Sequence, residues 1–299
     1  MKKVTACWVA GAASLAASFS TTPAFAFCRT TTCDPQTECS YDARGCTTVG
    51  LPLTWKSGCV SYSIQRDASP GRGVDYDTIH DIAERAFDRW TNADCRGGSP
   101  SLRTSDTGPV SCAEPEYNSN DPNANVIMFR DTSWPYAGAN ATLALTTITF
   151  NYDTGEIFDA DIEVNSFKTP LTTSNSVVDF DLESIITHEA GHFLGLSHSH
   201  VGSATMFVEY ERGDLSFRDL ESDDEEGICE AYPPNRDIGG DQCRPRHGFS
   251  PDCAPPPDEG CAIANSPTGS TRAWPLAFAL ALGVGLRLRI GRRQAKRAV

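Results

Sequence analysis

Three of the six histidines in this 299-residue chain lie in one stretch, HEAGHFLGLSH, which covers residues 188–198. His188 and His192 are four residues apart, and on a helix this spacing puts both imidazoles on one face, one turn apart. Two neutral imidazoles placed in this way can bind the same Zn²⁺ ion. Glu189 adjoins the first histidine, where it can take a proton from a metal-bound water. The stretch therefore predicts a zinc site that activates water.

Gly195 frees the backbone to leave this helix, because glycine adopts positive φ without steric cost. The turn would bring His198 back as a third ligand. Three protein ligands leave the fourth tetrahedral position to water, which distinguishes a catalytic zinc from a structural one. We therefore predict His188, His192 and His198 as ligands of one catalytic Zn²⁺, with Glu189 as the general base and acid.

The preceding residues fit a helix that would carry these groups. Asp179 or Asp181 can cap its first turn, because a carboxylate accepts the free N–H groups there. Its apolar face would include four residues, which are Leu182, Ile185, Ile186 and Phe193.

The chain from Cys59 onward has the pattern of a mixed α/β domain. Apolar residues recur at helical spacing between Tyr76 and Trp90, and Asp75 or Asp77 can cap that helix. Strands are expected where apolar residues alternate or cluster, at residues 60–64, 125–130, 143–152 and 158–164.

The last of these expected strands carries a row of acidic residues. Asp159, Asp161 and Glu163 alternate with apolar residues, so all three point to one face. The hydrophobic spacing makes them a solvated face. Calcium binding is the second interpretation, because hard cations bind clustered oxygen ligands. The sequence leaves both interpretations open.

The number of cysteines indicates an oxidising compartment. The chain has 12, which is too many for a typical cytosolic enzyme. Cys7 and Cys261 lie in the terminal segments described below, which leaves ten, an even number that allows disulfides throughout. None of the ten forms a C-x-x-C pair, so a cysteine zinc site or a thioredoxin-like redox motif has little support.

The pairing of these cysteines cannot be derived from the sequence, but two local expectations follow. The four cysteines from Cys28 to Cys46 predict a small N-terminal segment held by disulfides. A bridge between Cys95 and Cys112 would close a loop rich in Gly, Ser and Pro.

Both ends of the chain have the composition of targeting segments. Residues 1–26 begin with Lys2 and Lys3, continue as an apolar stretch and end in the A-x-A pattern of Ala24 and Ala26. This is the three-part pattern of a secretory signal peptide, and it predicts export of a mature chain that begins near Phe27.

The C-terminal end combines a short apolar run with a basic cluster. Ala273–Leu286 is short for an independent membrane span, and Arg287–Arg297 fits the positive-inside rule. Together with Cys261 and its polar spacer, this tail resembles the MYXO-CTERM type of bacterial sorting tail. That resemblance implies attachment or processing at the cell surface, and a plain membrane anchor is the alternative.

The charge of the chain excludes one class of function. It has 39 Asp and Glu against 25 Lys and Arg, for a net charge of −14, and every acidic residue lies between Asp34 and Glu259. A nucleic-acid-binding protein needs a basic face that neutralises phosphates, so this balance argues against nucleic acid as a partner.

The pattern H-E-x-x-H-x-x-G-x-x-H is the metzincin signature, and this sequence resembles that clan of zinc endopeptidases. Ser203–Met206 resembles the Met-turn of the clan, and Leu220–Pro233 resembles the last helix of the matrixins. The resemblance covers about Cys59–Tyr232. It implies an α+β fold of α/β/α type, with a mixed twisted sheet, two long helices including the active-site helix, a Met-turn and a C-terminal helix.

The resemblance also implies functional positions. Met206 would support the zinc site, and Phe207–Asp214 would form a wall of the pocket for the side chain beyond the scissile bond. An extended substrate would lie along an edge strand, which position in the chain places at Leu143, Ala144, Leu145 and Thr146.

The resemblance has limits in this sequence. The three other histidines are scattered, so the second, structural zinc of vertebrate matrixins has no evident ligand set. The cysteine-switch motif P-R-C-G is missing, and no tyrosine stands two residues after Met206. Latency through that switch and a fifth tyrosine ligand are therefore not supported.

The expected layout has five parts. Residues 233–260 lack periodicity and are rich in Pro and Gly, which predicts a linker held locally by Cys243 and Cys253. The parts are a signal peptide (1–26), a Cys-rich segment (27–58), a matrixin-like domain (59–232), the linker (233–260) and the tail (261–299).

The expected function is that of a zinc endopeptidase, secreted or attached to the cell surface. We expect a monomer that acts on protein or peptide substrates and meets the export and C-terminal sorting machineries. The rival interpretation is a catalytically silent, surface-displayed zinc-binding adhesion or matrix protein. Glu189 argues against this rival, because a structural zinc site needs no base.

Overall fold

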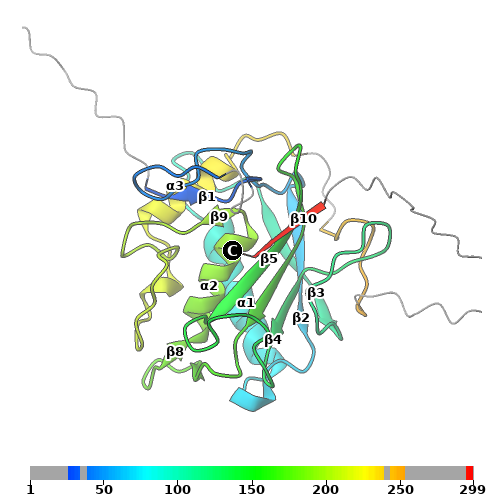
Figure 1. Ribbon diagram of the computed structural model, residues 1–299, viewed down its shortest axis with the longest axis vertical. Coiled ribbons are helices and arrows are strands. Elements are labelled where there is room, and N and C mark those ends of the chain that lie inside the picture. Colours follow the sequence, from blue (N-terminus) through cyan, green and yellow to red (C-terminus); the bar gives the residue numbers. More distant parts are fainter. Residues whose placement is uncertain (1–25, 34–38, 239–242, 253–293, 299) are drawn as a thin grey trace, which may run out of the picture.

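The computed structural model describes residues 26–33, 39–238, 243–252 and 294–298. Its centre is a six-stranded sheet in the order β10-β5-β6-β4-β2-β3 (Figure 1). Strands β3, β2, β4 and β6 are parallel neighbours, whereas β5 is antiparallel to β6 and to β10. The bounds are β2 Cys59–Gln65, β3 Arg103–Val110, β4 Val126–Phe129, β5 Ala144–Asn151, β6 Ile157–Val164 and β10 Gln294–Ala298.

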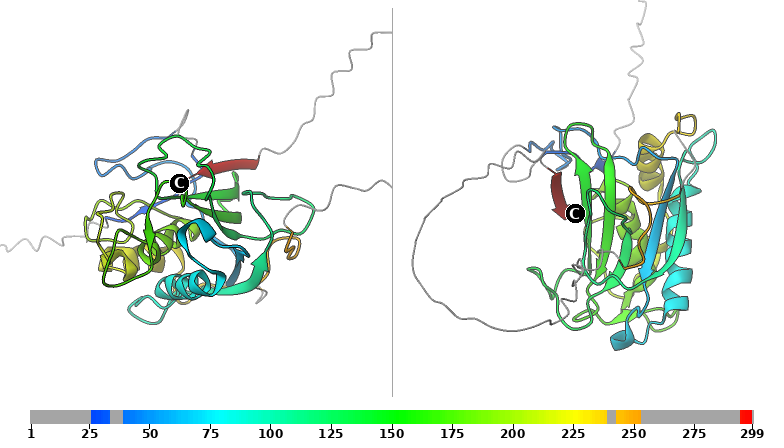
Figure 2. Two further views of the ribbon diagram at one scale, coloured as in Figure 1. Left: turned by 90° about the horizontal axis from the view of Figure 1, so that it is seen from below. Right: turned by 90° about the vertical axis from the view of Figure 1, so that its right-hand side faces the viewer.

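Two helices lie against one face of this sheet, as the views in Figure 2 show. They are α1 Tyr76–Thr91 and α2 Leu182–Phe193, and the third helix is α3 Ser222–Ala231. Two-stranded pairs join β1 Cys28–Arg29 to β9 Leu196–Ser197 and β7 Leu171–Thr172 to β8 Phe180–Asp181. Short 3₁₀ turns occur at Pro70–Arg72 and Ser216–Arg218. The mixed sheet with its two long helices confirms the predicted α+β fold.

The core between the sheet and the helices follows from the apolar spacing of α1. Asp75 caps this helix by accepting a hydrogen bond from the backbone N–H of Thr78 at 2.9 Å. Its buried face places Phe87 against the ring of Tyr62 at 4.4 Å and against Phe193 of α2 at 5.1 Å. Each large side chain buried in this way contributes about 1.5–3 kcal/mol. The same contacts fix α2, which carries His188 and His192, against α1.

The expected Cys95–Cys112 bridge is wrong. Cys95 is bonded to Cys229, and Cys112 is in a different disulfide. The chain between Cys95 and Cys112 is not a closed loop, because it contains β3. A strand of this length spans roughly 25 Å, whereas the Cα atoms of a disulfide lie within about 7 Å.

The expected local bridge between Cys243 and Cys253 is also wrong, because Cys243 is bonded to Cys59 at the start of β2. The described residues that follow α3 lie against the domain. Arg236 donates a hydrogen bond to the carbonyl of Trp55 at 2.7 Å, and the guanidinium of Arg246 stacks on the ring of Phe158 at 4.0 Å.

The Cys-rich N-terminal segment is held by two disulfides, as predicted. They join Cys28 to Cys46 and Cys33 to Cys39.

The predicted targeting segments lie almost entirely outside the described residues. This holds for residues 1–25 of the expected signal peptide and for residues 253–293, which include Cys261 and the apolar run. Among the described residues, no helix combines the length and the apolar character needed to cross a membrane.

Candidate active site

Helix α2 begins and ends at residues whose chemistry defines its bounds. Asp181 caps its N-terminus by accepting a hydrogen bond from the backbone N–H of Ser184 at 2.8 Å, and its carboxylate also pairs with Arg218. After the helix, Gly195 takes a φ of +92°. A Cβ at Gly195 would overlap the carbonyl oxygen of Leu53. Glycine therefore provides both the turn and the close approach that start the chain toward His198.

The three predicted histidines converge. Their ligand nitrogens all lie within 4.8 Å of one another, and the Nε2 atoms of His192 and His198 are 3.2 Å apart. The outer nitrogens face backbone carbonyls, with His188 Nδ1 at 2.6 Å from the oxygen of Thr205 and His192 Nδ1 at 3.0 Å from that of Leu196. These contacts hold the rings with Nε2 directed to the common point.

The donor set fits zinc. Burial lowers the pKa of His188 to about 4, and it lowers the pKa of His192 and of His198 as well. The imidazoles are therefore neutral near pH 7, as metal ligands must be. Zn–N bonds of about 2.0–2.1 Å in a tetrahedral arrangement place ligand nitrogens somewhat over 3 Å apart, which agrees with the separation of His192 and His198.

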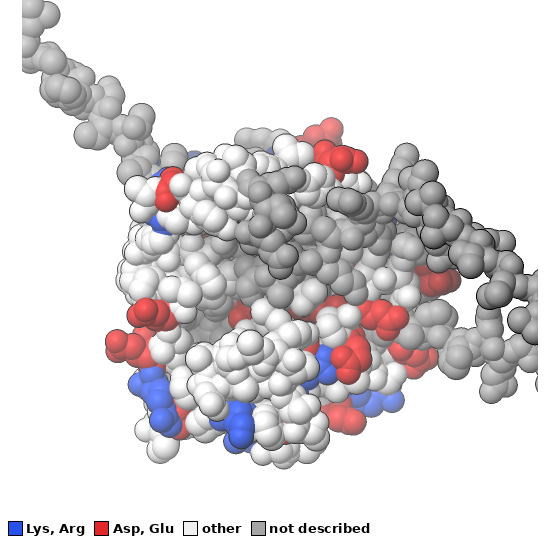
Figure 3. Space-filling model, viewed as in Figure 1, with Lys and Arg blue, Asp and Glu red and all other residues white. Residues whose placement is uncertain are grey.

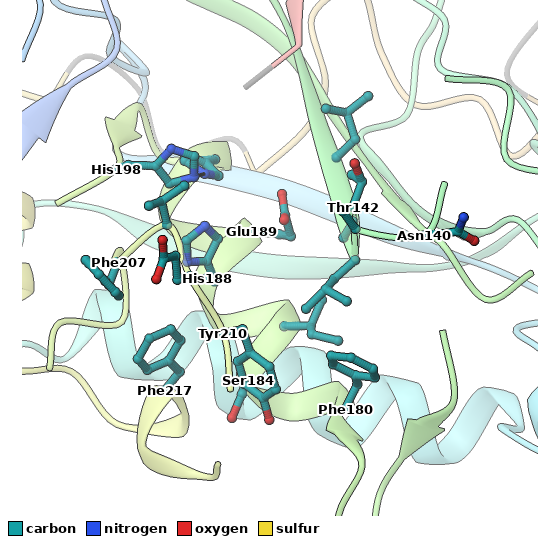
Figure 4. A pocket seen from close by; sticks show the side chains of 18 residues that line it. Asn140, Thr142, Phe180, Ser184, His188, Glu189, His198, Phe207, Tyr210 and Phe217 are labelled. Atoms are coloured by element: carbon teal, nitrogen blue, oxygen red, sulfur yellow. Dashed lines mark hydrogen bonds between the residues drawn. The ribbon is translucent and has the colours of Figure 1, made fainter. Parts of the chain in front are cut away.

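Glu189 lies between the histidines and β5, with its carboxylate in the same cavity (Figure 4). Burial raises its pKa to about 7. Its Oε2 accepts a hydrogen bond from the hydroxyl of Thr146 at 2.5 Å. A carboxyl group with this pKa can take up and release a proton near neutrality.

The Met-turn lies directly beneath α2. Met206 is buried, and a Cβ on Gly191 of α2 would overlap its Sδ atom. Asp224 of α3 supports this turn, because its carboxylate accepts the backbone N–H groups of Thr205 at 2.7 Å and Met206 at 3.0 Å. Since the carbonyl of Thr205 also faces His188 Nδ1, α3 is linked through the turn to one of the three histidines.

A cavity of about 640 Å³ opens beside the histidines. Three of the four predicted substrate-binding residues line it, namely Leu143, Ala144 and Leu145, whereas Thr146 contacts Glu189 instead. Of the segment Phe207–Asp214 that the resemblance placed at the pocket, Phe207–Tyr210 lines the cavity and residues 211–214 do not. Figure 4 shows aromatic rings below the histidines, and these belong to Phe180, Tyr210 and Phe217.

A family model described as matrixin matches residues 54–233, which is more than half of the chain. The chain belongs to the matrixin family. It is similar to Metalloendoproteinase 5-MMP of Arabidopsis thaliana, with 50% identity over 62 residues that cover 20% of this chain and 17% of that protein. It is also similar to Metalloendoproteinase 2-MMP of the same plant, with 34% identity over 110 residues, or 36% and 27% of the two chains. The matched stretches thus span about a quarter or less of these relatives.

The acidic row on β6 of this matrixin is not a solvated face. Asp159, Asp161 and Glu163 are all buried, so that prediction is wrong. The segment between β3 and β4 covers them, because the backbone N–H of Glu116 donates to Asp161 at 3.1 Å. Sequence periodicity showed that the row shares a face but did not show what lies on that face.

The same row does not converge as the histidines do. Two clusters of His, Cys, Asp or Glu with ligand atoms within 4.8 Å occur among the described residues, and neither includes the row. Glu163 instead accepts from Arg130 at 2.6 Å and from the Tyr136 hydroxyl at 2.5 Å. Asp161 accepts from the backbone N–H groups of Val126 and Glu116. These oxygens are already engaged by donors of the protein.

Several residues of the matrixin site escaped the sequence analysis. Gly191, Asp224, Phe180 and Phe217 lie at the site because of contacts between distant segments. The only signal for Gly191 was its place within the motif, and the only signal for Asp224 was its place within Leu220–Pro233, the stretch that resembles the last matrixin helix.

Proposed function

We propose that this matrixin is an exported zinc-dependent endopeptidase that cleaves extended segments of extracellular proteins. One observation carries the proposal: three inward-facing imidazole nitrogens and the Glu189 carboxylate share one open cavity. Zinc binding alone would need only the imidazoles. A buried carboxylate with a pKa of about 7 beside them is suited to proton transfer.

The proposed chemistry divides between the metal and Glu189. When bound by His188, His192 and His198, Zn²⁺ supplies Lewis acidity to a water and to the scissile carbonyl. The Glu189 carboxylate takes one proton from that water as the water attacks the carbonyl carbon. It then delivers this proton to the leaving amine, so the base is regenerated. The Thr146 hydroxyl orients Oε2 during these transfers.

The substrate is proposed to lie as an antiparallel strand on the outer edge of β5, beside Leu143–Thr146. Farther from the histidines this edge pairs with β10, where Thr147 lies opposite Ala298 and Asn151 opposite Gln294. This edge of β5 can therefore pair with an additional strand. In such pairing, backbone hydrogen bonds provide affinity and side-chain pockets provide specificity. The cavity lined by Phe180 and Phe217 would then take an apolar side chain beyond the scissile bond.

Export and surface attachment are part of the proposal. Four disulfides within the described residues support an oxidising compartment. We propose that residues 1–26 are removed as a signal peptide and that the tail 261–299 directs surface sorting. On the described surface in Figure 3, Lys and Arg are interspersed with Asp and Glu instead of forming one basic patch. The excess of 39 Asp and Glu over 25 Lys and Arg in the sequence favours protein substrates over nucleic acid.

Replacing Glu189 by Gln tests the proposal. The neutral amide keeps the shape of the side chain but cannot accept the proton, so kcat/KM on a casein-type substrate should fall by about 10³-fold or more. Bound zinc, measured by elemental analysis, should stay at the wild-type level. The control is Glu211→Gln, which makes the same change at an exposed carboxylate.

Two results would overturn the proposal. Cleavage by the Glu189→Gln variant at the wild-type rate would exclude Glu189 as the base. The second test is digestion of a broad peptide library by zinc-loaded wild-type protein, with chelator-treated protein as the comparison. If neither sample cleaves any peptide, the rival interpretation of a zinc-binding adhesion protein is favoured.

A further inference from the structure

An N-terminal segment that lies outside the family match is joined to the loop that carries the third histidine. The matrixin match begins at residue 54, whereas residues 26–33 and 39–53 precede it. Within this segment β1 adds an antiparallel strand to β9, with Cys28 opposite Ser197 and Arg29 opposite Leu196. Figure 1 shows this blue segment beside β9 and α3. Strand β9 ends immediately before His198.

Thr30 makes the contacts closest to the histidines. Its backbone N–H donates to the carbonyl of Gly195 at 3.1 Å, and its hydroxyl donates to the carbonyl of Leu196 at 2.8 Å. The Leu196 oxygen also faces His192 Nδ1 at 3.0 Å. The Thr30 hydroxyl and a zinc-ligand histidine therefore share one carbonyl, and Thr30, His192, Gly195 and Leu196 are all buried.

The other side of this short segment is fixed to Leu53, the residue immediately before the matched domain. The backbone N–H of Leu53 donates to the carbonyl of Thr30 at 2.8 Å, and the Arg29 guanidinium donates to the carbonyl of Leu53 at 2.8 Å. The Cys28–Cys46 disulfide ties the beginning of β1 to a turn at Gly45. That turn lies near His200, since a Cβ on Gly45 would be 3.3 Å from the His200 ring.

We infer that the segment before residue 54 is a disulfide-fastened clamp that positions the third-ligand loop, with Thr30 as its positioning residue. The hydroxyl of Thr30 holds the Leu196 carbonyl, which orients His192 and fixes the backbone two residues before His198. Groups bonded directly to a metal-ligand histidine, as the Leu196 carbonyl is, typically change metal affinity by about 10–100-fold, and Thr30 acts through that carbonyl, so we expect an effect near the lower end of this range. The inference rests on the zinc site of the proposed function, but it does not depend on peptide cleavage.

Thr30→Val tests the inference in the full-length exported protein, because valine keeps the shape of the side chain and removes the hydroxyl. The zinc dissociation constant, measured by chelator competition with ZnCl₂, should rise by about tenfold or more. The visible spectrum of the Co²⁺-substituted variant should differ from that of wild type, since the ligand geometry changes. Thr30→Ser, which restores a hydroxyl, should recover both properties.

The matched control is Thr48→Val in the same segment. Thr48 is exposed, and its hydroxyl donates to the carbonyl of Ser40 at 3.1 Å, away from the third-ligand loop. This variant should keep wild-type zinc affinity and the wild-type cobalt spectrum. An unchanged dissociation constant in Thr30→Val would overturn the clamp, even if its unfolding temperature fell.

A second pair of variants applies if Thr30→Val does not fold. Removal of the Cys28–Cys46 bridge by replacing both cysteines with Ala should weaken zinc binding, whereas removal of Cys59–Cys243 in the same way should not. Equal zinc affinities in the two double variants would contradict the inference. Wild-type protein that binds zinc tightly without cleaving peptides would refute the proposed function and leave the clamp intact.

Discussion

The histidine site and the acidic row on β6 are both buried clusters of titratable groups, yet they are organised in opposite ways. On α2 the i, i+4 spacing brings imidazoles to one point, and backbone carbonyls orient their outer nitrogens. On β6 the i, i+2 spacing puts the carboxylates on one face without gathering them at one point, and Asp161 and Glu163 are bound by donors of the protein. Ligand residues at regular spacing thus form a metal site only when the element gathers them and leaves their lone pairs free.

The backbone around the two regions reinforces this difference. Carbonyl oxygens face the outer nitrogens of His188 and His192, so each of these two rings presents its other nitrogen to the centre. Backbone N–H groups and the Arg130 guanidinium surround the acidic row, so its carboxylates act as acceptors within the fold. The histidine nitrogens are therefore free to bind a cation, whereas the carboxylates of the acidic row bind donors of the protein and stabilise the fold.

Removal of one histidine should have the largest effect of the changes considered, and the effect should be on zinc binding. His192→Ala deletes one of three ligands, so the zinc dissociation constant should rise by more than about 100-fold, beyond the effect of losing an outer partner. Peptidase activity should fall with zinc content. Elemental analysis after dialysis checks this, with Asp161→Asn as the control that should keep its zinc. Retention of zinc by His192→Ala at the wild-type level would show that the cation binds elsewhere.

Removal of the cation from the ion pair in the acidic row should lower the stability of the fold and leave zinc binding unchanged. Glu163 is fully buried and the Arg130 side chain is 12% exposed, so Arg130→Met leaves a buried carboxylate without its cation. Removal of one partner of such a pair typically costs about 3–5 kcal/mol. We expect a clear decrease in the free energy of unfolding in urea, with zinc affinity unchanged.

The control for that prediction is the double variant Arg130→Met/Glu163→Met, which removes both charges and should recover part of the loss. Calcium offers a second check. Addition of CaCl₂ should shift the unfolding midpoint of the wild type and of Glu163→Gln equally, because the oxygens of Glu163 already accept from Arg130 and Tyr136. A calcium shift that disappears in Glu163→Gln would restore the acidic row as a cation site.

These two regions also show what could be predicted from the sequence. The histidine site was predictable because its information is local: the ligands lie within eleven residues, and helix geometry fixes their spacing. A mixed α/β domain followed from the apolar periodicity in α1, α2 and the central strands, and the α+β fold class followed from the family resemblance. Strand β3 was missed because its sequence, RTSDTGPV, is polar and lacks apolar alternation.

Other features depend on contacts between distant segments. The burial of Asp161 depends on the chain that crosses it after β3, and the Cys59–Cys243 pairing joins residues 184 positions apart. The role of Gly191 follows from the position of Met206 beneath α2. Sequence spacing specifies the face on which a residue lies, whereas its neighbour across that face is set by the complete fold.

The smallest expected effect concerns pH and the two aspartates of the row. Burial raises the pKa of Asp161 to about 7 from its ordinary 3.8, and its neighbours Asp159 and Glu163 bear on the same titration. The unfolded chain loses this proton near pH 4, whereas the folded protein keeps it until about pH 7. Stability from this group therefore falls as the pH rises between these values and then levels off.

Asp159→Asn should reduce that loss, because the amide can donate a hydrogen bond to the ionised Asp161 without carrying a charge of its own. Above pH 7 the unfolding temperature of the variant should exceed that of wild type by a few degrees, at roughly 2–4 °C per kcal/mol for a domain of this size. Near pH 4 the two proteins should unfold together. Thermal unfolding at both pH values, in the presence of zinc, separates this effect from metal loss. If Asp159→Asn were destabilised equally at pH 4 and pH 8, the aspartate pair would affect stability through packing and not through charge. The acidic row would then differ from the histidine site only in the geometry of its side chains.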